Sequence, residues 1–147
     1  DSGRFLYSAL YRAGFASQPG ATAQEDGLTL KDLWITAVCR CVPPDNKPVA
    51  DEIEKCKPFL MRELHCLSKV EGIVAFGKIA YDAALKLTGR HKGAPVFGHG
   101  VFYPAINNAP WILASYHPSR QNTQTGRLTP SMFDTIWDEV KRLLVFS

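Results

Sequence analysis

An α/β fold is predicted by two features of this sequence. Short apolar runs of strand length alternate with longer segments whose apolar residues have helical spacing. Strands that alternate with helices are joined by right-handed crossovers, which give a parallel sheet covered by helices on both faces. The 147 residues, of which 46% are hydrophobic, suffice for one domain with such a three-layer core.

The first half of the chain is expected to hold two helices and one strand. Residues 3–15 have the periodicity of an amphipathic helix, and the polar residues 16–29 are typical of a loop. The nearly continuous apolar run 33–38 resembles a strand that is buried on both faces. A second helix is expected from about 50 to 67, with a kink or break at Pro58, because proline removes a helical hydrogen bond.

The second half continues the alternation. Residues 72–76 predict a strand, and the alanine-rich segment 77–89, bounded by glycines, predicts a helix. Residues 90–110 are rich in proline and glycine and are expected to be irregular. The apolar run 111–116 predicts a third strand. The last helix is expected to begin at Thr129-Pro130, with the threonine as N-cap and the proline at the first helical position.

The composition bounds the class of protein. No apolar run approaches the roughly 20 residues of a membrane span, and no signal peptide is recognisable. The net charge of +3 permits a nucleic acid partner but does not demand one. Four cysteines without a secretory signal indicate a reducing compartment, where thiols or metal ligands are commoner than disulfides.

A polar loop after the run 111–116 carries the strongest candidate site. His117 stands at the carboxyl end of this predicted strand, where an open α/β sheet places its working residues. Histidine exchanges protons readily near neutral pH. Pro118 stiffens the turn, and the following side chains offer hydrogen bonds suited to phosphates and bases: Ser119, Arg120, Gln121 and Asn122. The alternative is a connecting loop that merely contains a histidine.

Cysteines form a second, weaker candidate site. Cys41 follows the predicted strand 33–38, and Cys56 lies on the next helix. Such a pair could hold half of an iron–sulfur cluster or of a zinc site, although no Cys-x-x-Cys motif is present. Cys39 is a further thiol nearby. The alternative is that these are core residues, which suits Cys66 best because it ends a helical apolar stripe.

Five blocks of sequence, in one order along nearly the whole chain, resemble a single family. The blocks are Gly3-Arg4-Phe5-Leu6, Ile35 to Val38 leading to Cys41-Val42-Pro43-Pro44-Asp45-Asn46-Lys47-Pro48, Glu52-Ile53 with Cys56-Lys57-Pro58-Phe59-Leu60, Phe97-Gly98-His99-Gly100, and Ser115 to Asn122 with Thr125-Gly126-Arg127-Leu128-Thr129. They resemble the uracil-DNA glycosylase superfamily, above all its iron–sulfur-containing family 5 (type B).

The resemblance implies a three-layer α/β/α sandwich around a parallel four-stranded sheet, with residues 1–147 as a single, N-terminally incomplete domain. The first strand is expected upstream, which agrees with a sequence that opens directly in a helical pattern. Cys41 and Cys56 would be two ligands of a 4Fe–4S cluster whose other two ligands also lie upstream. The family further implies a monomer in a prokaryotic cytoplasm, associated with the nucleoid.

The resemblance also implies a DNA repair enzyme that initiates base excision repair. It would flip a deaminated base out of double-stranded DNA and hydrolyse its N-glycosidic bond, with uracil as substrate and hypoxanthine and others beside it. His117 would donate a hydrogen bond to the base oxygen on which charge develops. Residues 120–122 would wedge into the duplex, with Ser119 at the phosphates and Pro118 stiffening the turn.

One position departs from the family pattern. Related glycosylases often carry an asparagine that reads the base where this chain has Ala37. Alanine cannot hydrogen-bond the uracil edge and would relax discrimination among deaminated bases, although Ala37 is equally explained as a buried strand residue. His99 either lines the DNA or is simply exposed. Lys47, Arg120 and Arg127 are either phosphate contacts or solvated charges.

Competing functions are a metal-binding domain or a DNA-binding α/β domain without catalytic activity. Iron with sulfide would favour the glycosylase, and zinc would favour the metal-binding alternative. An α/β enzyme of another class that acts on nucleotides has no support, because the sequence contains no dinucleotide or phosphate loop and no Gly-x-Ser-x-Gly elbow.

Overall fold

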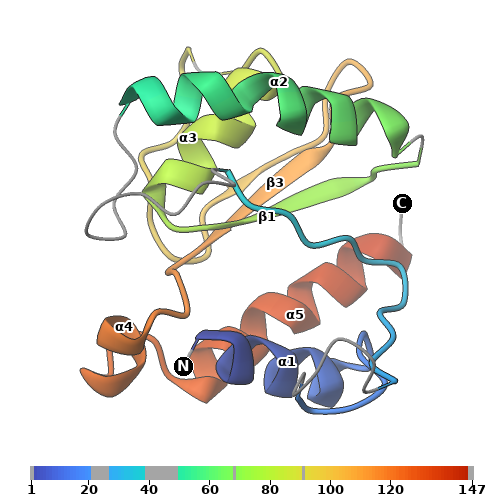
Figure 1. Cartoon of the computed structure of the whole chain (residues 1–147), viewed down its shortest axis with the longest axis vertical. Helices are drawn as coiled ribbons and strands as arrows, with labels where there is room; N and C mark the ends of the chain where they lie inside the picture. Colours follow the sequence, from blue (N-terminus) through green and yellow to red (C-terminus); the bar gives the residue numbers. More distant parts are fainter. Residues whose placement is uncertain (1, 21–26, 39–49, 68, 91, 146–147) are drawn as a thin grey trace.

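The computed structural model describes residues 2–20, 27–38, 50–67, 69–90 and 92–145. In chain order the elements are α1 (Ser2–Ala13), α2 (Ala50–Cys66), β1 (Gly72–Phe76), α3 (Lys78–Leu87), β2 (Phe102–Tyr103), β3 (Trp111–Ser115), α4 (Arg120–Gln124) and α5 (Pro130–Val145). Figure 1 shows α2 and α3 on one side of β1 and β3, and α1 and α5 on the other. The predicted α/β sandwich is confirmed.

The sheet of the described residues has the strand order β1-β3-β2, with β3 in the centre. β1 and β3 run parallel, with Gly72 opposite Trp111 and Phe76 opposite Ser115. Every residue of β3 is buried, because it is flanked by strands on both sides and covered by helices on both faces. This explains why its sequence is a continuous apolar run rather than an alternating one.

Two hydrophobic clusters hold the layers together. The larger one joins α1 and α5 to one face of the sheet, and its aromatic rings interlock: the ring of Phe133 lies 5.6 Å from Phe76 and 5.7 Å from Trp137, measured between centroids. The smaller one packs Tyr81 of α3 against Ile112 on the opposite face. Helices therefore cover both faces of the sheet, and the spacing of their apolar residues predicted these helices from the sequence.

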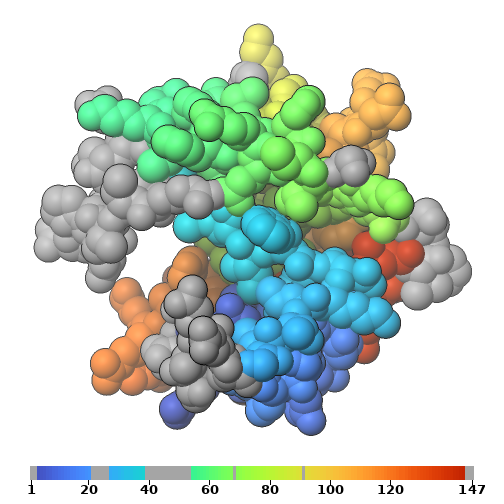
Figure 2. Space-filling model, turned by 45° about the vertical axis from the view of Figure 1, so that its right-hand side comes forward, coloured from blue at the N-terminus to red at the C-terminus, as the bar shows by residue number. Residues whose placement is uncertain are grey.

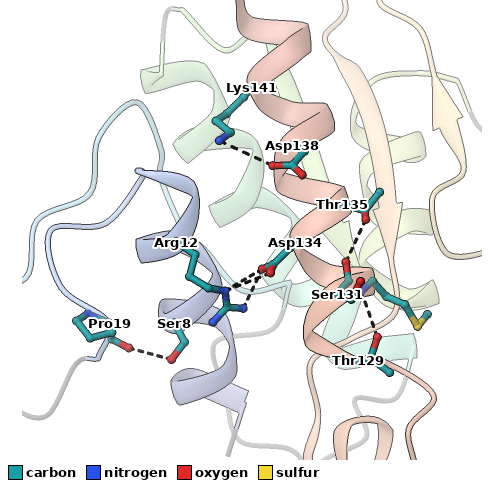
Figure 3. Close-up of polar contacts among 10 residues, drawn as sticks. Ser8, Arg12, Pro19, Thr129, Ser131, Asp134, Thr135, Asp138 and Lys141 are labelled. Carbon is teal, nitrogen blue, oxygen red and sulfur yellow. Dashed lines mark hydrogen bonds and ion pairs between the residues drawn. The ribbon is translucent and has the colours of Figure 1, made fainter.

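The start of α5 forms as the sequence predicts. The Thr129 hydroxyl accepts a hydrogen bond from the backbone N–H of Met132 at 3.2 Å, and Pro130 is the first helical residue. One turn further, Asp134 accepts hydrogen bonds from Arg12 of α1 through Nε at 3.1 Å and Nη2 at 2.8 Å (Figure 3). This exposed ion pair fixes the rotation of α1 on α5 more than it adds stability.

The first residue of β1 is a glycine, Gly72, because the neighbouring strand leaves no room for a side chain there. A Cβ atom built on Gly72 would lie 1.9 Å from Cε2 of the Trp111 indole, which belongs to the residue opposite in the register. Real contacts are never that short, so any larger residue would displace the indole or the strand. Gly72 thus permits the largest side chain of β3 to lie flat against β1.

The run 33–38 is not a strand, contrary to the prediction. It is an extended segment with exposed side chains, among them Trp34 at 62% and Ile35 at 39%. In Figure 2 the cyan residues 27–38 lie at the surface, between the green atoms of α2 and the blue atoms of α1. No described strand pairs with the segment. A side-chain hydrogen bond connects it to α2 instead: the indole N–H of Trp34 donates to Oε2 of Glu63 at 3.0 Å.

The expectation that every strand of the sheet in this chain is parallel needs correction. The described residues form three strands, the number expected of this chain, but the third, β2, runs antiparallel to β3. β2 lies inside the segment 90–110, which was expected to be irregular. Two residues are too few to show any periodicity, so only the open edge of β3 makes this segment a strand.

Helix α2 passes through Pro58 without the predicted break. Pro58 lies on the exposed side of the helix, so water can hydrate the carbonyl group that loses its hydrogen bond. Among the described helices, none combines the length and the apolar character that a membrane crossing requires.

Candidate active site at the carboxyl ends of β1 and β3

The carboxyl ends of β1 and β3 meet at one edge of the sheet, because the two strands are parallel. The N–H of Gly77, directly after β1, donates to the carbonyl oxygen of Ser115 at 2.8 Å. Gly77 has φ = +91°, and a Cβ there would lie 3.5 Å from Cβ of His117. The distance to His117 would allow a Cβ, so it is the positive backbone angle that favours glycine at this turn.

His117 is exposed to solvent. Protein atoms around its ring nevertheless displace part of the surrounding water, and this desolvation lowers the pKa of His117 below its ordinary value. The ring is therefore mostly neutral at pH 7. A neutral imidazole carries one N–H and can donate one hydrogen bond while its other nitrogen accepts.

We expect the ring-proton NMR signals of His117 to titrate with a midpoint below the ordinary histidine pKa of 6.5. The folded chain binds this proton less readily than the unfolded chain does, so folding loses stability as the pH falls through 6.5 towards the folded pKa. The signals can be assigned by their disappearance in His117→Ala. A midpoint at or above 6.5 would contradict the desolvation of the ring.

Residues 118–122 form a folded turn rather than the open loop that was expected. The Ser119 hydroxyl accepts a hydrogen bond from the N–H of Asn122 at 3.2 Å and so caps the short helix α4. The side-chain amide of Asn122 donates to the carbonyl oxygen of His117 at 2.9 Å. Serine is a preferred N-cap residue, and this signal in the sequence could have revealed α4.

The same turn divides its side chains into two groups. Pro118 is buried, and Ser119 and Asn122 make hydrogen bonds within the turn. Arg120 and Gln121 are exposed, and no described side-chain hydrogen bond joins either of them to the rest of the turn. The structure therefore brings all five predicted residues next to His117, but it leaves Arg120 and Gln121 the best exposed for an external partner.

Tyr116 is a part of this site that sequence reasoning missed. Its ring is contacted by Phe97 at 6.3 Å and His99 at 5.0 Å between centroids, and the Arg127 guanidinium lies 4.7 Å from its centre. Both ring nitrogens of His99 have partners inside the protein and the residue is half-buried, so it is not merely exposed. That His99 lines the DNA stays a prediction. Arg127 is exposed, but it also stacks on Tyr116.

The predicted cysteine site is only partly described. Cys56 is a buried thiol on α2, 6% exposed, whereas Cys39 and Cys41 lie outside the described residues. The described side chains include no group of three or more histidines, cysteines or carboxylates that could hold a metal. Cys66 is exposed, so its assignment as a core residue is wrong. Thiol ligands suit iron–sulfur or zinc chemistry, and a buried Cys56 fits either.

Two further candidates are Ala37 and Lys47. Ala37 is exposed on the extended segment after α1, which excludes the alternative that it is a buried strand residue. Lys47 lies outside the described residues.

The fold and the site together define a class of protein. The molecule is an α/β sandwich with a neutral, accessible histidine at the carboxyl ends of parallel strands, where open α/β enzymes bind their ligands. The sequence matches the family model of the Uracil DNA glycosylase superfamily over residues 1–141. The chain belongs to this superfamily.

Similar proteins carry a more particular name. The chain is 46% identical over 142 residues to the type-5 uracil-DNA glycosylase of Thermus thermophilus, covering 97% of this chain and 64% of that protein. It is 43% identical over 144 residues to that of Mycobacterium tuberculosis, covering 97% and 53%. For the type-5 enzyme of Pyrobaculum aerophilum the identity is 36% over 128 residues, covering 87% and 54%. The chain thus spans 53–64% of the length of these relatives.

Proposed function

We propose that the protein containing this chain is a DNA repair glycosylase that removes uracil and other deaminated bases, including hypoxanthine, from double-stranded DNA. The observation that carries the proposal is the accessible, neutral His117 at the carboxyl edge of β3. Membership of the uracil-DNA glycosylase superfamily supports the reaction class. The product, a site without a base, is the starting point of base excision repair. The enzyme acts as a monomer.

The reaction breaks the bond between C1′ of the sugar and the base nitrogen. The bonding electron pair leaves with the base, which becomes anionic, and water adds to the cation-like sugar carbon. His117 donates its N–H to the base oxygen on which this negative charge collects. A neutral ring suits this role, because its donor does not depend on first capturing a proton from solvent.

The base must first leave the duplex. Unstacking costs a few kcal/mol and costs least at a mispair, which favours U·G over normal pairs. Exposed Arg120 and Gln121, together with Asn122, form the wedge that enters the vacated space. Pro118 and Ser119 hold the wedge in position through the buried ring and the cap of α4. Arg120 and Arg127 supply positive charge towards the phosphates.

Cys41 and Cys56 would be two ligands of a 4Fe–4S cluster, and other parts of the protein would supply the remaining two. Burial of Cys56 supports this assignment, since a thiolate ligand is commonly shielded from solvent. When bound, such a cluster would cross-link α2 to the segment that carries Cys41 and would have no part in the hydrolysis.

The cluster assignment predicts the metal content of the full-length protein. Iron and acid-labile sulfide should be present together, and both should fall in Cys41→Ser and Cys56→Ser. Cys66→Ser is the matched control, because Cys66 is exposed on the same helix as Cys56 and should leave the iron content unchanged. Zinc in place of iron would instead support a metal-binding domain.

The reaction is tested with a labelled duplex that contains one U·G pair. We expect the full-length protein to produce strand cleavage after alkali treatment, and a duplex with hypoxanthine to be processed as well. The 147-residue chain should be assayed in parallel. If the full-length protein leaves every deaminated base intact, the proposal fails, and a DNA-binding or metal-binding domain without catalytic activity becomes the better explanation.

A further inference from the structure

His99 lies directly beside the residue that precedes His117. Its ring is 5.0 Å from the ring of Tyr116, and its Nδ1 lies 3.1 Å from the backbone nitrogen of Tyr116. On its other side, Nε2 lies 3.3 Å from the carbonyl oxygen of Met132 in the first turn of α5. His99 thus connects the end of the central strand to the helix that covers it.

These two contacts determine the tautomer of His99. A backbone N–H can only donate, so Nδ1 must carry a lone pair and accept from Tyr116. A carbonyl oxygen can only accept, so Nε2 must carry the proton and donate to Met132. Both nitrogens are used, and the ring orientation is fixed by its hydrogen-bond partners.

The hydrogen bond from Tyr116 occurs where the sheet can no longer supply one. On the β2 side of β3 the last backbone hydrogen bonds are those of Ala114, whose N–H donates to Val101 and whose carbonyl oxygen accepts from Gly100, each at 2.8 Å. Tyr116 is two residues further along on the same side of the strand, and its N–H would have no strand partner. An unpaired N–H in a part-buried position is costly, and Nδ1 of His99 provides the acceptor.

The chain around His117 is thereby held on both sides. Before it, the Tyr116 N–H is bound to His99, and the Tyr116 carbonyl oxygen accepts from the Ser115 hydroxyl at 2.9 Å. After it, the carbonyl oxygen of His117 accepts from Asn122 at 2.9 Å. Among these contacts, only the hydrogen bond to His99 connects the chain around His117 to a distant part of the fold, because Nε2 of the same ring donates to Met132 of α5.

We propose that His99 is a positioning residue of the glycosylase reaction: its Nδ1 fixes the backbone at Tyr116 and so holds the donor of His117 at the developing charge of the base. This inference rests on the proposed function. Holding a donor in place matters because a displacement of about 1 Å can cost on the order of 10²-fold in rate.

The test uses His99→Phe and His99→Asn in the full-length protein. Phenylalanine keeps a ring against Tyr116 but offers no acceptor, whereas asparagine can place its amide oxygen near the position of Nδ1. In single-turnover assays on the U·G duplex, we expect His99→Phe to slow cleavage on the order of 10²-fold with an unchanged Kd for the duplex. His99→Asn should recover most of that rate.

His65→Phe is the matched control, because His65 is exposed in the last turn of α2. If His99→Phe does not fold, His99→Gln replaces it, since the longer amide reaches the Nε2 position rather than Nδ1. Equal rates for the unsubstituted protein and His99→Phe, or equal defects in folded Phe and Asn variants, would overturn the proposal.

Amide hydrogen exchange at Tyr116 separates this inference from the function on which it rests. The Tyr116 N–H should be protected in the unsubstituted protein and in His99→Asn, and should exchange faster in His99→Phe. An inactive unsubstituted protein would refute the proposed function, and exchange would then still decide whether His99 holds the turn. Unchanged protection in His99→Phe would show that it does not.

Discussion

Replacing His117 with alanine is expected to slow uracil excision by the full-length protein by about 10²–10³-fold, the loss observed when an enzyme loses one donor to a developing oxyanion. The reason is that His117 lies at the carboxyl edge of β3 with an accessible, neutral ring. The hydrogen bond strengthens as the base becomes anionic, so the transition state loses more than the ground state does. The measurement is single-turnover cleavage of a U·G duplex.

The controls separate chemistry from folding and binding. Duplex affinity should change little in His117→Ala, because the exposed side chains of Arg120 and Gln121 are untouched. His65→Ala, an exposed histidine on α2, should retain the full rate. A His117→Ala protein that is folded and as fast as the unsubstituted one would remove His117 from the mechanism and with it the main argument for the proposed reaction.

Replacing Arg90 with methionine is expected to lower the free energy of unfolding by about 2–4 kcal/mol, because two carbonyl groups would lose their buried donors. Arg90 is only 7% exposed. Its Nη1 donates to the carbonyl oxygen of Pro104 at 2.9 Å, its Nη2 to that of Pro110, and its Nε to the Thr88 hydroxyl at 3.1 Å. Its guanidinium also lies 4.7 Å from the centre of the Tyr103 ring.

Urea unfolding of matched variants can measure this effect. Arg90→Lys should be intermediate, because a lysine keeps the charge but cannot donate in several fixed directions at once. Lys86→Met removes an exposed charge from the neighbouring helix α3 and should change stability little. Equal stability of Arg90→Met and the unsubstituted chain would mean that water satisfies the two carbonyl groups.

The Arg90 prediction also bears on the site. Arg90 ties together the two ends of the segment that contains Phe97 and His99, and both of these side chains contact Tyr116. A loosened segment would therefore release the support of the residue before His117. Arg90→Met should accordingly increase amide exchange at Tyr116, although it is remote from the proposed chemistry.

Local signals in the sequence were sufficient for six elements and for the position of His117. Periodicity predicted α1, α2, α3 and α5, and Thr129-Pro130 marked the start of the last of these. Short apolar runs predicted β1 and β3 to within one residue. His117 was found because it follows a buried strand, and the strand end is itself visible in the sequence.

Contacts between distant parts of the chain decided the rest. The run 33–38 has strand composition but no described strand to pair with, whereas Phe102–Tyr103 becomes a strand because the edge of β3 is open to it. His99 meets a residue 17 positions away and another 33 positions away, and no local pattern encodes either contact. A hydrogen bond needs a partner at about 3 Å. The sequence by itself determined which segments are helical or apolar and that His117 follows a buried strand, and only the tertiary structure decided which partners hold the chain around His117 in place.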